Sequence, residues 1–318
     1  MPELRREAIL RRWVAISDPP AIETAEGCPF CPGNEARTPP ETYALREPPG
    51  PPNSTGWQVR VVSNKYPFFR LEGGMAKRAE GMYDLMNNLG AHEIVIETPD
   101  HEETWPQMEL RQLENIIKAY RQRYMELRGD PRFKQIFVAR HNRRSAHDYH
   151  NSLSHIVTMA VIPRRIDEEI NGTLDYLRRK DRCIFCDIIY QEQRDQTRVI
   201  IDTESFLTFA PYASRYRYET WVMPKGHLPD FARITDPQIS DLAYNLKTIY
   251  TKFQKALDDP VVSFILHTTP LQEAYREEYH WHIELRPRLE RQPGFEWGTG
   301  FFINFVAPER AAAALREA

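Results

Sequence analysis

Polar and apolar residues alternate through Tyr279-His280-Trp281-His282-Ile283-Glu284-Leu285-Arg286-Pro287-Arg288. Successive side chains of a β-strand point to opposite faces, so the alternation predicts that His280, His282 and Glu284 share one face. The apolar residues between them would pack into a core. Two imidazoles and one carboxylate on a common face are typical of a metal or acid–base site, although an ordinary half-buried strand could carry the same pattern.

Length and composition are those of a globular protein. The chain has 318 residues, of which 41% are hydrophobic and 27% are charged, and its formal net charge is -3. No long basic run is present, so the sequence disfavours binding to nucleic acid or to an anionic membrane. No apolar stretch reaches the length of a membrane span or resembles a secretory signal. We therefore expect a cytoplasmic protein whose partner is a small molecule.

The four cysteines form two Cys-x-x-Cys pairs, Cys28 with Cys31 and Cys183 with Cys186. Such a pair is either half of a metal site or a redox centre, and two copies of one spacing favour metal. The redox alternative lacks the βαβ neighbourhood that it requires, and four unrelated buried thiols would not repeat a spacing. Zinc is the metal that this ligand type predicts.

The predicted elements occur twice in the same order. Amphipathic helices are predicted over 106–128 and 237–257, and an Asp-Pro pair closes each one. Strands are predicted before and after each helix, over 57–62, 93–97, 135–139 and 155–162 in the first half and over 198–201, 206–210, 219–223, 261–267 and 279–285 in the second. The sequence thus predicts an internal duplication, with domains 1–170 and 171–318, and an α+β fold in which helices pack on antiparallel sheets.

Each half also offers the same four metal ligands: two cysteines, a histidine just after a strand, and a histidine in a later strand. The two sets are Cys28, Cys31, His101 and His155, and Cys183, Cys186, His227 and His280. A closed Cys2His2 set is typical of structural zinc, so two structural zinc sites per chain are predicted. Alternatively, a histidine such as His101 only caps a loop, and the second cluster recruits His267 and His282.

Several segments together resemble a known family. CIFCDII, PKGH and HWHIELRPR are similar to the histidine triad superfamily of nucleotide hydrolases and transferases. With CPFCPGNE, VVSNKYPFF, GAHEIVIETPDH and PGFEWGTGFFIN, the chain resembles the galactose-1-phosphate uridylyltransferase family, and within it the subgroup that includes ADP-glucose phosphorylase. The resemblance implies two fused half-barrel units, zinc at both ligand sets and a homodimer. It also implies transfer of a nucleoside monophosphate between a nucleotide sugar and a hexose 1-phosphate through a phosphohistidine.

The catalytic position departs from the family pattern. The family nucleophile is the second histidine of a His-x-His in the first half, but Val157 stands two residues after His155, and valine cannot attack phosphorus. A shifted alignment would instead make His155 the nucleophile, and the first zinc would lose a ligand or take His147 or His150. Another alternative is a hydrolase that uses His282 with Glu284. A zinc- and nucleotide-binding protein without catalysis is also compatible with the sequence.

The resemblance implies further site residues. Asn64, Lys65 and Tyr66 match a segment that lines the nucleotide pocket, and Asn142 and Ser152 could donate hydrogen bonds to phosphate. In uridylyltransferases the counterparts of His267, His280 and His282 bind a metal together with a glutamate, here Glu168 or Glu169. That arrangement competes with the second Cys2His2 set for His280, and the intact Cys183 and Cys186 favour the Cys2His2 set.

Overall fold

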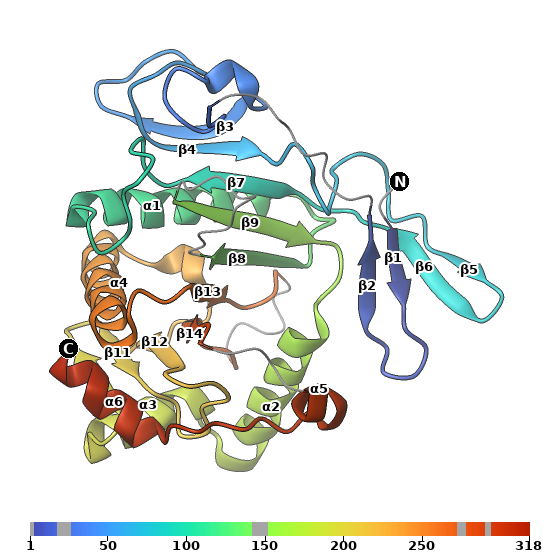
Figure 1. Ribbon diagram of the computed structural model, residues 1–318. Coiled ribbons are helices and arrows are strands. Elements are labelled where there is room, and N and C mark those ends of the chain that lie inside the picture. The colour runs from blue at the N-terminus through green and yellow to red at the C-terminus, as the bar shows by residue number, and fades with distance from the viewer. Residues whose placement is uncertain (1–2, 18–26, 142–151, 272–277, 290–293) are drawn as a thin grey trace.

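The computed structural model describes residues 3–17, 27–141, 152–271, 278–289 and 294–318. Within these residues a ten-stranded antiparallel sheet forms the centre of the protein (Figure 1). Its strand order is β10-β11-β12-β14-β13-β8-β9-β7-β4-β3. The first-half strands are β3 (Glu41–Arg46), β4 (Trp57–Ser63), β7 (His92–Ile96), β8 (Gln135–His141) and β9 (Leu153–Met159). The second-half strands are β10 (Val199–Asp202), β11 (Phe206–Phe209), β12 (Thr220–Pro224), β13 (Val262–His267) and β14 (His282–Pro287).

The strand order reads the same from either edge when corresponding strands of the two halves are matched. β8 and β13 meet at the centre, β9 and β14 flank them, and β3 and β10 form the two edges. The predicted duplication and the α+β class are therefore confirmed, and both copies lie in one sheet. The pairing of β8 with β13 joins the halves by antiparallel backbone hydrogen bonds, for example with Ile265 opposite Ala139.

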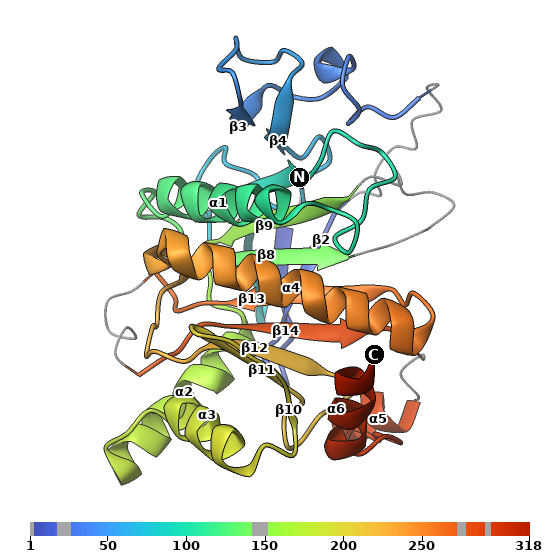
Figure 2. The ribbon, with the colours of Figure 1, turned by 90° about the vertical axis from the view of Figure 1, so that its left-hand side faces the viewer.

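Two long helices cover one face of the sheet. α1 (Leu110–Leu127) and α4 (Asp236–Leu257) lie side by side across it (Figure 2). The apolar side of each helix is buried, and a single core cluster contains residues from both helices and both halves of the sheet. Thr235 and Gln238 form a capping box at the start of α4, where Thr235 accepts a hydrogen bond from the Gln238 backbone. Both predicted helices are confirmed.

The remaining described elements are a small second sheet and four further helices, of which α2 (Arg164–Lys180) and α3 (Ile184–Asp195) pack on the second-half strands. A four-stranded sheet of order β2-β1-β6-β5 contains β1 (Glu3–Arg6), β2 (Trp13–Ile16), β5 (Arg78–Glu80) and β6 (Tyr83–Asn87). The other two helices are α5 (Gly294–Thr299) and α6 (Pro308–Glu317), with short 3-10 turns η1 (Glu35–Arg37) and η2 (Phe231–Arg233). The predicted division between residues 170 and 171 falls inside α2.

Two strands that carry candidate site residues, β14 and β9, begin at other residues than the sequence predicted. β14 begins at His282, so Tyr279, His280 and Trp281 precede the strand. β9 begins at Leu153, two residues before the predicted start at His155. In β9 the side chains of Ser154 and Ile156 face the helices, which leaves Leu153, His155 and Val157 on the opposite face of the sheet. On this side of the sheet α2 and α3 cover the second-half strands. We call the first-half part of this surface, opposite α1, the open face.

Candidate metal centres and nucleotide site

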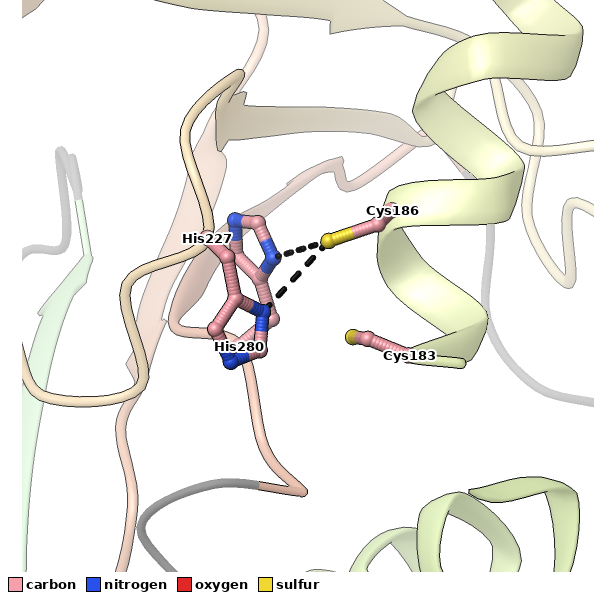
Figure 3. Close-up of side chains that lie close together, drawn as sticks. All are labelled: Cys183, Cys186, His227 and His280. Atoms are coloured by element: carbon pink, nitrogen blue, oxygen red, sulfur yellow. Dashed lines mark hydrogen bonds between the residues drawn. The ribbon is translucent and has the colours of Figure 1, made fainter. Parts of the chain in front are cut away.

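Cys183, Cys186, His227 and His280 converge in the second half (Figure 3). Their potential ligand atoms all lie within 4.8 Å of one another. The Sγ atom of Cys186 is 3.4 Å from Nδ1 of His227 and 3.7 Å from Nδ1 of His280. The structure thus brings together all four residues of the second predicted set. Two thiolates and two imidazoles are a donor set that fits tetrahedral zinc.

Local structure orients these ligands. Cys183 is the N-cap residue of α3 and Cys186 lies in its first turn, where the positive end of the helix dipole stabilises thiolate. Hydrogen bonds from Cys186, His227 and His280 lower the pKa of Cys183 despite its burial. The Nε2 atom of His280 lies 2.8 Å from the Pro224 carbonyl oxygen, to which it donates. That bond directs the other ring nitrogen, Nδ1, toward the cysteines.

Cys28, Cys31 and His101 form a second, three-membered group in the first half. The Sγ atom of Cys31 is 3.2 Å from Nδ1 of His101. His155 lies outside this group, so the prediction that it completes the first zinc set is not supported. The reason is strand register. His155 pairs with Ile94, in the middle of β7, whereas His101 lies beyond the last residue of that strand, Ile96. The alternative ligands His147 and His150 fall outside the described residues.

A third group consists of Glu169, His267, His282 and Glu284, whose potential ligand atoms also lie within 4.8 Å of one another. Glu169 comes from α2, His267 from β13, and His282 and Glu284 from β14. His267 is 3.2 Å from Glu169 through Nδ1 and 3.6 Å from Glu284 through Nε2. These four side chains could hold a metal without any ligand from the cysteine group. Of the two glutamates named from the resemblance, Glu169 belongs here, and Glu168 instead pairs with Arg164.

His280 and His282 therefore belong to different groups, contrary to the prediction of one shared surface. His280 precedes the strand and faces the cysteines, whereas the ring of His282 stacks on that of His267. The two ring centroids lie 4.7 Å apart at an angle of 7°. Alternation holds only inside the regular strand, and β14 starts at His282.

Charge is distributed unevenly within the third group. Burial disfavours the charged form of His267, but the carboxylates of Glu169 and Glu284 outweigh it and raise the pKa of His267 to about 9. Burial and the neighbouring His267 lower the pKa of His282 to about 4. Glu284 also receives hydrogen bonds from Arg165 at 2.5 Å and from Arg215 at 2.8 Å. Glu284 thus interacts with three basic side chains, those of Arg165, Arg215 and His267.

His282 is enclosed by other rings. It is 1% exposed, and the rings of Phe185 and Trp221 lie 5.1 and 5.2 Å from it, centroid to centroid. Its Nδ1 lies 3.1 Å from the His280 carbonyl oxygen. A substrate could reach this imidazole only after the surrounding aromatic side chains had moved.

A histidine pair lies on the open face of the first half. Nε2 of His92, the first residue of β7, is 3.1 Å from Nδ1 of His155 in β9. His92 is 6% exposed and His155 is half-buried. Asn64 approaches the His92 ring through its amide nitrogen, at 3.4 Å from Nδ1 and 3.3 Å from Nε2. Asn64 thus lies beside the pair, with Lys65 and Tyr66 next to it in an exposed turn.

Ser152 has a different role from the predicted phosphate donor. It is buried, its hydroxyl donates to Glu97 at 2.5 Å, and it accepts from Arg140 at 2.8 Å. This hydroxyl is therefore engaged in a buried ionic network. Asn142, the other predicted donor, falls outside the described residues.

His92 was not singled out from the sequence. A signal was present, because His92, Ile94 and Ile96 alternate with Glu93 and Val95 at the start of a predicted strand. Glu93 binds Arg123 of α1, so His92 must face away from the helices. The sequence did not indicate that His155 is the neighbour of His92 across the sheet.

No helix in the described ranges is both long and apolar enough to cross a membrane.

Similarity to known proteins extends over nearly the whole chain. Residues 16–155 match the N-terminal domain of galactose-1-phosphate uridyl transferase, and residues 169–293 match its C-terminal domain. The chain is 30% identical to the ADP-glucose phosphorylase of Arabidopsis thaliana, over 99% of this chain and 93% of that protein. It is 26% identical to the galactose-1-phosphate uridylyltransferase of Thermotoga maritima, over 100% of this chain and 98% of that protein.

Solved structures give the same result. The crystal structure of the Arabidopsis thaliana ADP-glucose phosphorylase with bound ADP-glucose has a TM-score of 0.81, covering 100% of this chain and 99% of that one. A uridylyltransferase structure that is 22% identical has a TM-score of 0.85, covering 99% of this chain and 98% of that one, and thus shares the fold. Sequence matches across both halves, and a matching fold, lead to one conclusion: the chain belongs to the galactose-1-phosphate uridylyltransferase family.

Proposed function

We propose that this protein is a nucleotidylyltransferase that moves a nucleoside monophosphate from a nucleotide sugar to a phosphate acceptor, either a hexose 1-phosphate or orthophosphate. The observation that carries the proposal is the cluster of His155, His92 and Asn64 on the open face of the first half. The full-length similarity to an ADP-glucose phosphorylase and to uridylyltransferases supports this reaction class. The nucleotide would lie over the turn at Asn64, Lys65 and Tyr66, with its phosphates toward His155.

Accessibility supports the first half over the second. His155 is half-buried, whereas His282 is 1% exposed beneath aromatic rings. A hydrolase that used His282 would need its nucleophile to meet a phosphate through that cover. We therefore assign His282, with Glu169, His267 and Glu284, to a candidate metal site and not to substrate capture.

We also propose that Leu153 occupies the position of the family nucleophile. β9 starts at Leu153 and β14 starts at His282, so matching the strand starts makes Leu153 the counterpart of His282 and His155 the counterpart of Glu284. The replaced residue is then Leu153 and no longer Val157. Neither side chain can attack phosphorus. A phosphohistidine in this protein would require another imidazole, and among the described residues on this face His155 is the accessible candidate.

Zinc has a structural part in the proposal. Cys183, Cys186, His227 and His280 would hold one ion, and Cys28, Cys31 and His101 would supply three ligands to another. Zinc bound at these ligands would tie the start of each half to its sheet. A homodimer is proposed as well, supported by exposed aromatic side chains near the C-terminus at Phe295, Trp297 and Phe301, and sedimentation velocity would report it.

Turnover measurements test the proposed function. The zinc-loaded protein is mixed with ADP-glucose or UDP-glucose, each with orthophosphate and with galactose 1-phosphate, and released glucose 1-phosphate is measured. We expect turnover with at least one pair and a loss of about 10²- to 10³-fold for His155→Ala, the effect of removing a phosphate-binding donor. Val157→Ala, on the same strand and face, is the matched control and should keep its activity.

Two outcomes would contradict the proposal. Absence of turnover with all four pairs would leave a zinc- and nucleotide-binding protein without catalysis. Full activity in His155→Ala, with unchanged metal content, would exclude the first-half face as the reaction site.

A further inference from the structure

We propose that His92 is a positioning residue that holds His155 in one tautomer. In that tautomer His155 carries its proton on Nε2 and meets the substrate phosphate as a neutral hydrogen-bond donor, not as a nucleophile. The inference rests on the proposed nucleotidyl transfer and names how its central residue acts. It also predicts that transfer in this protein is direct, without a nucleotidyl-histidine intermediate.

A backbone donor beside His92 determines its tautomer. The backbone N–H of Phe68 donates to Nδ1 of His92 at 3.4 Å. The Asn64 amide nitrogen also faces the ring, but it lies 3.4 Å from Nδ1 and 3.3 Å from Nε2 and so does not distinguish the two nitrogens. With the Phe68 N–H directed at it, Nδ1 of His92 is an acceptor, and a neutral ring then carries its proton on Nε2.

The proton position on His92 sets that on His155. Nε2 of His92 lies 3.1 Å from Nδ1 of His155, so the Nε2–H of His92 donates to that nitrogen. A neutral His155 that accepts at Nδ1 has its own proton on Nε2. The chain of donors therefore runs from the Phe68 amide through His92 to His155 and on toward the substrate.

Burial keeps His92 neutral, which preserves the direction of this chain. The His92 ring stacks on Phe68 with centroids 5.5 Å apart and an angle of 21°. Burial, together with the adjacent His155, lowers the pKa of His92 to about 3. At neutral pH His92 thus remains a single-proton ring with a fixed donor and a fixed acceptor.

The sheet holds the two rings in place. His92 is paired with Val157 and Ile94 is paired with His155, so the histidines are diagonal neighbours on adjacent strands. Both strands lie in the interior of the ten-stranded sheet. A donor mounted on such rigid elements is preorganised, which is the property that makes hydrogen bonds to a phosphoryl group effective in catalysis.

The chemistry balances without a protein nucleophile. An oxygen of the acceptor phosphate forms a bond to the α-phosphorus of the nucleotide sugar, and the bond from that phosphorus to the bridging oxygen breaks. The sugar 1-phosphate leaves with the bonding electron pair and needs no proton from His155. Nε2–H of His155 stabilises the charge on the phosphoryl oxygens and keeps its proton throughout.

Nitrogen-15 NMR of histidine-labelled, zinc-loaded protein tests the tautomer directly. We expect His155 to show the Nε2–H tautomer, and to lose that preference in His92→Phe, which retains the stack on Phe68 but has no N–H. The same variant should lower kcat at least about tenfold, less than loss of the donor itself, with little change in KM for the nucleotide sugar. His92→Gln, which can donate through its amide, should restore part of kcat.

Intact-protein mass after mixing with the nucleotide sugar alone completes the test. We expect no increase of one nucleoside monophosphate, and we expect initial-rate kinetics of the sequential type. An adduct that disappears in His155→Ala, or His155 found with its proton on Nδ1, would overturn the inference while leaving the proposed transfer intact. Absence of any turnover, with the Nε2–H tautomer observed, would instead refute the proposed function.

Discussion

Ser152 illustrates how one side chain can be assigned to the wrong task. Its hydroxyl lies between Glu97 and Arg140, two charged groups that form an ion pair with 2.9 Å between Nε and Oε2. Glu97 also accepts from Trp105 at 2.8 Å. A buried ion pair retains its stability only when its remaining hydrogen-bonding atoms are satisfied. Ser152, the residue just before β9, therefore stabilises this buried ion pair and is turned away from the open face.

Removal of this hydroxyl should affect stability and leave substrate binding unchanged. Ser152→Ala leaves Nη2 of Arg140 without its hydrogen-bond partner and removes one of the donors to Glu97, so we expect a loss of about 1–3 kcal/mol in the free energy of unfolding. Denaturant unfolding measures it, and KM for the nucleotide sugar should stay constant. Ser240→Ala, at an exposed position of α4, is the control. A raised KM with unchanged stability would return Ser152 to the phosphate site.

His92 should make stability depend on pH. Its pKa is depressed to about 3 in the folded protein, below its ordinary value of 6.5, so the unfolded chain binds the proton first. The contribution is complete above pH 6.5 and is lost as pH falls toward 3. Relative to His92→Phe, the wild-type free energy of unfolding should fall by up to about 1.4 kcal/mol per pH unit below pH 6.5. Chemical denaturation at pH 7, 6 and 5 measures it, and parallel curves would contradict it.

At the scale of elements, α3 is attached to the sheet through its first turn. Cys183 and Cys186 meet His227, which follows β12, and His280, which precedes β14. Two strand ends and one helix start are thus brought to a point in the second half. Ligand sets that connect separate elements are typical of structural zinc, where metal binding contributes directly to folding.

Removal of one cysteine should remove one ion. Cys183→Ser is expected to lower bound zinc by one equivalent per chain, measured by atomic emission, and to lower the midpoint of thermal unfolding because α3 loses its tie. Cys28→Ser is the matched variant for the other half and should remove the other ion. Unchanged zinc in Cys183→Ser would contradict the assignment of this group. A loss of both ions from one substitution would show that the two sites are coupled through the fold.

At the scale of the whole molecule, the two copies share a sheet and a core. β8 pairs with β13 along four residue pairs, from Ser263 with His141 to Leu266 with Val138. α1 and α4 pack on each other. Arg121 of α1 also donates a hydrogen bond to the Ile234 carbonyl of the second half, which links the two halves directly. The predicted domains 1–170 and 171–318 are therefore proposed as copies in evolution and not as independent folding units.

Either half alone should fail to fold. A chain of residues 1–170 would expose β8 as a sheet edge together with the apolar side of α1, and exposed hydrophobic edges promote aggregation. We expect size-exclusion chromatography to show aggregates for each half, and joint expression of both halves to restore a defined species. A single cooperative unfolding transition for an isolated half, followed by calorimetry, would contradict this prediction.

Much of the fold could be predicted from local patterns. The helices at Leu110–Leu127 and Asp236–Leu257 were predictable because their apolar residues recur at helical spacing between clear end signals. The four residues around Cys183 were predictable because ligand types and their order along the chain repeat. The small sheet built on Glu3–Arg6 was missed, since short strands with mixed polarity carry little periodic signal.

Sequence by itself determined the duplication, the family and the kinds of ligand, because these depend on residue type and spacing along the chain. Tertiary structure alone decided which residues meet: it separated His280 from His282, moved His155 away from Cys28 and Cys31, and placed it beside His92. The physical reason is register. A shift of one or two residues in where a strand starts or pairs changes the neighbours of every side chain on it, and that shift is set by contacts between segments far apart in sequence.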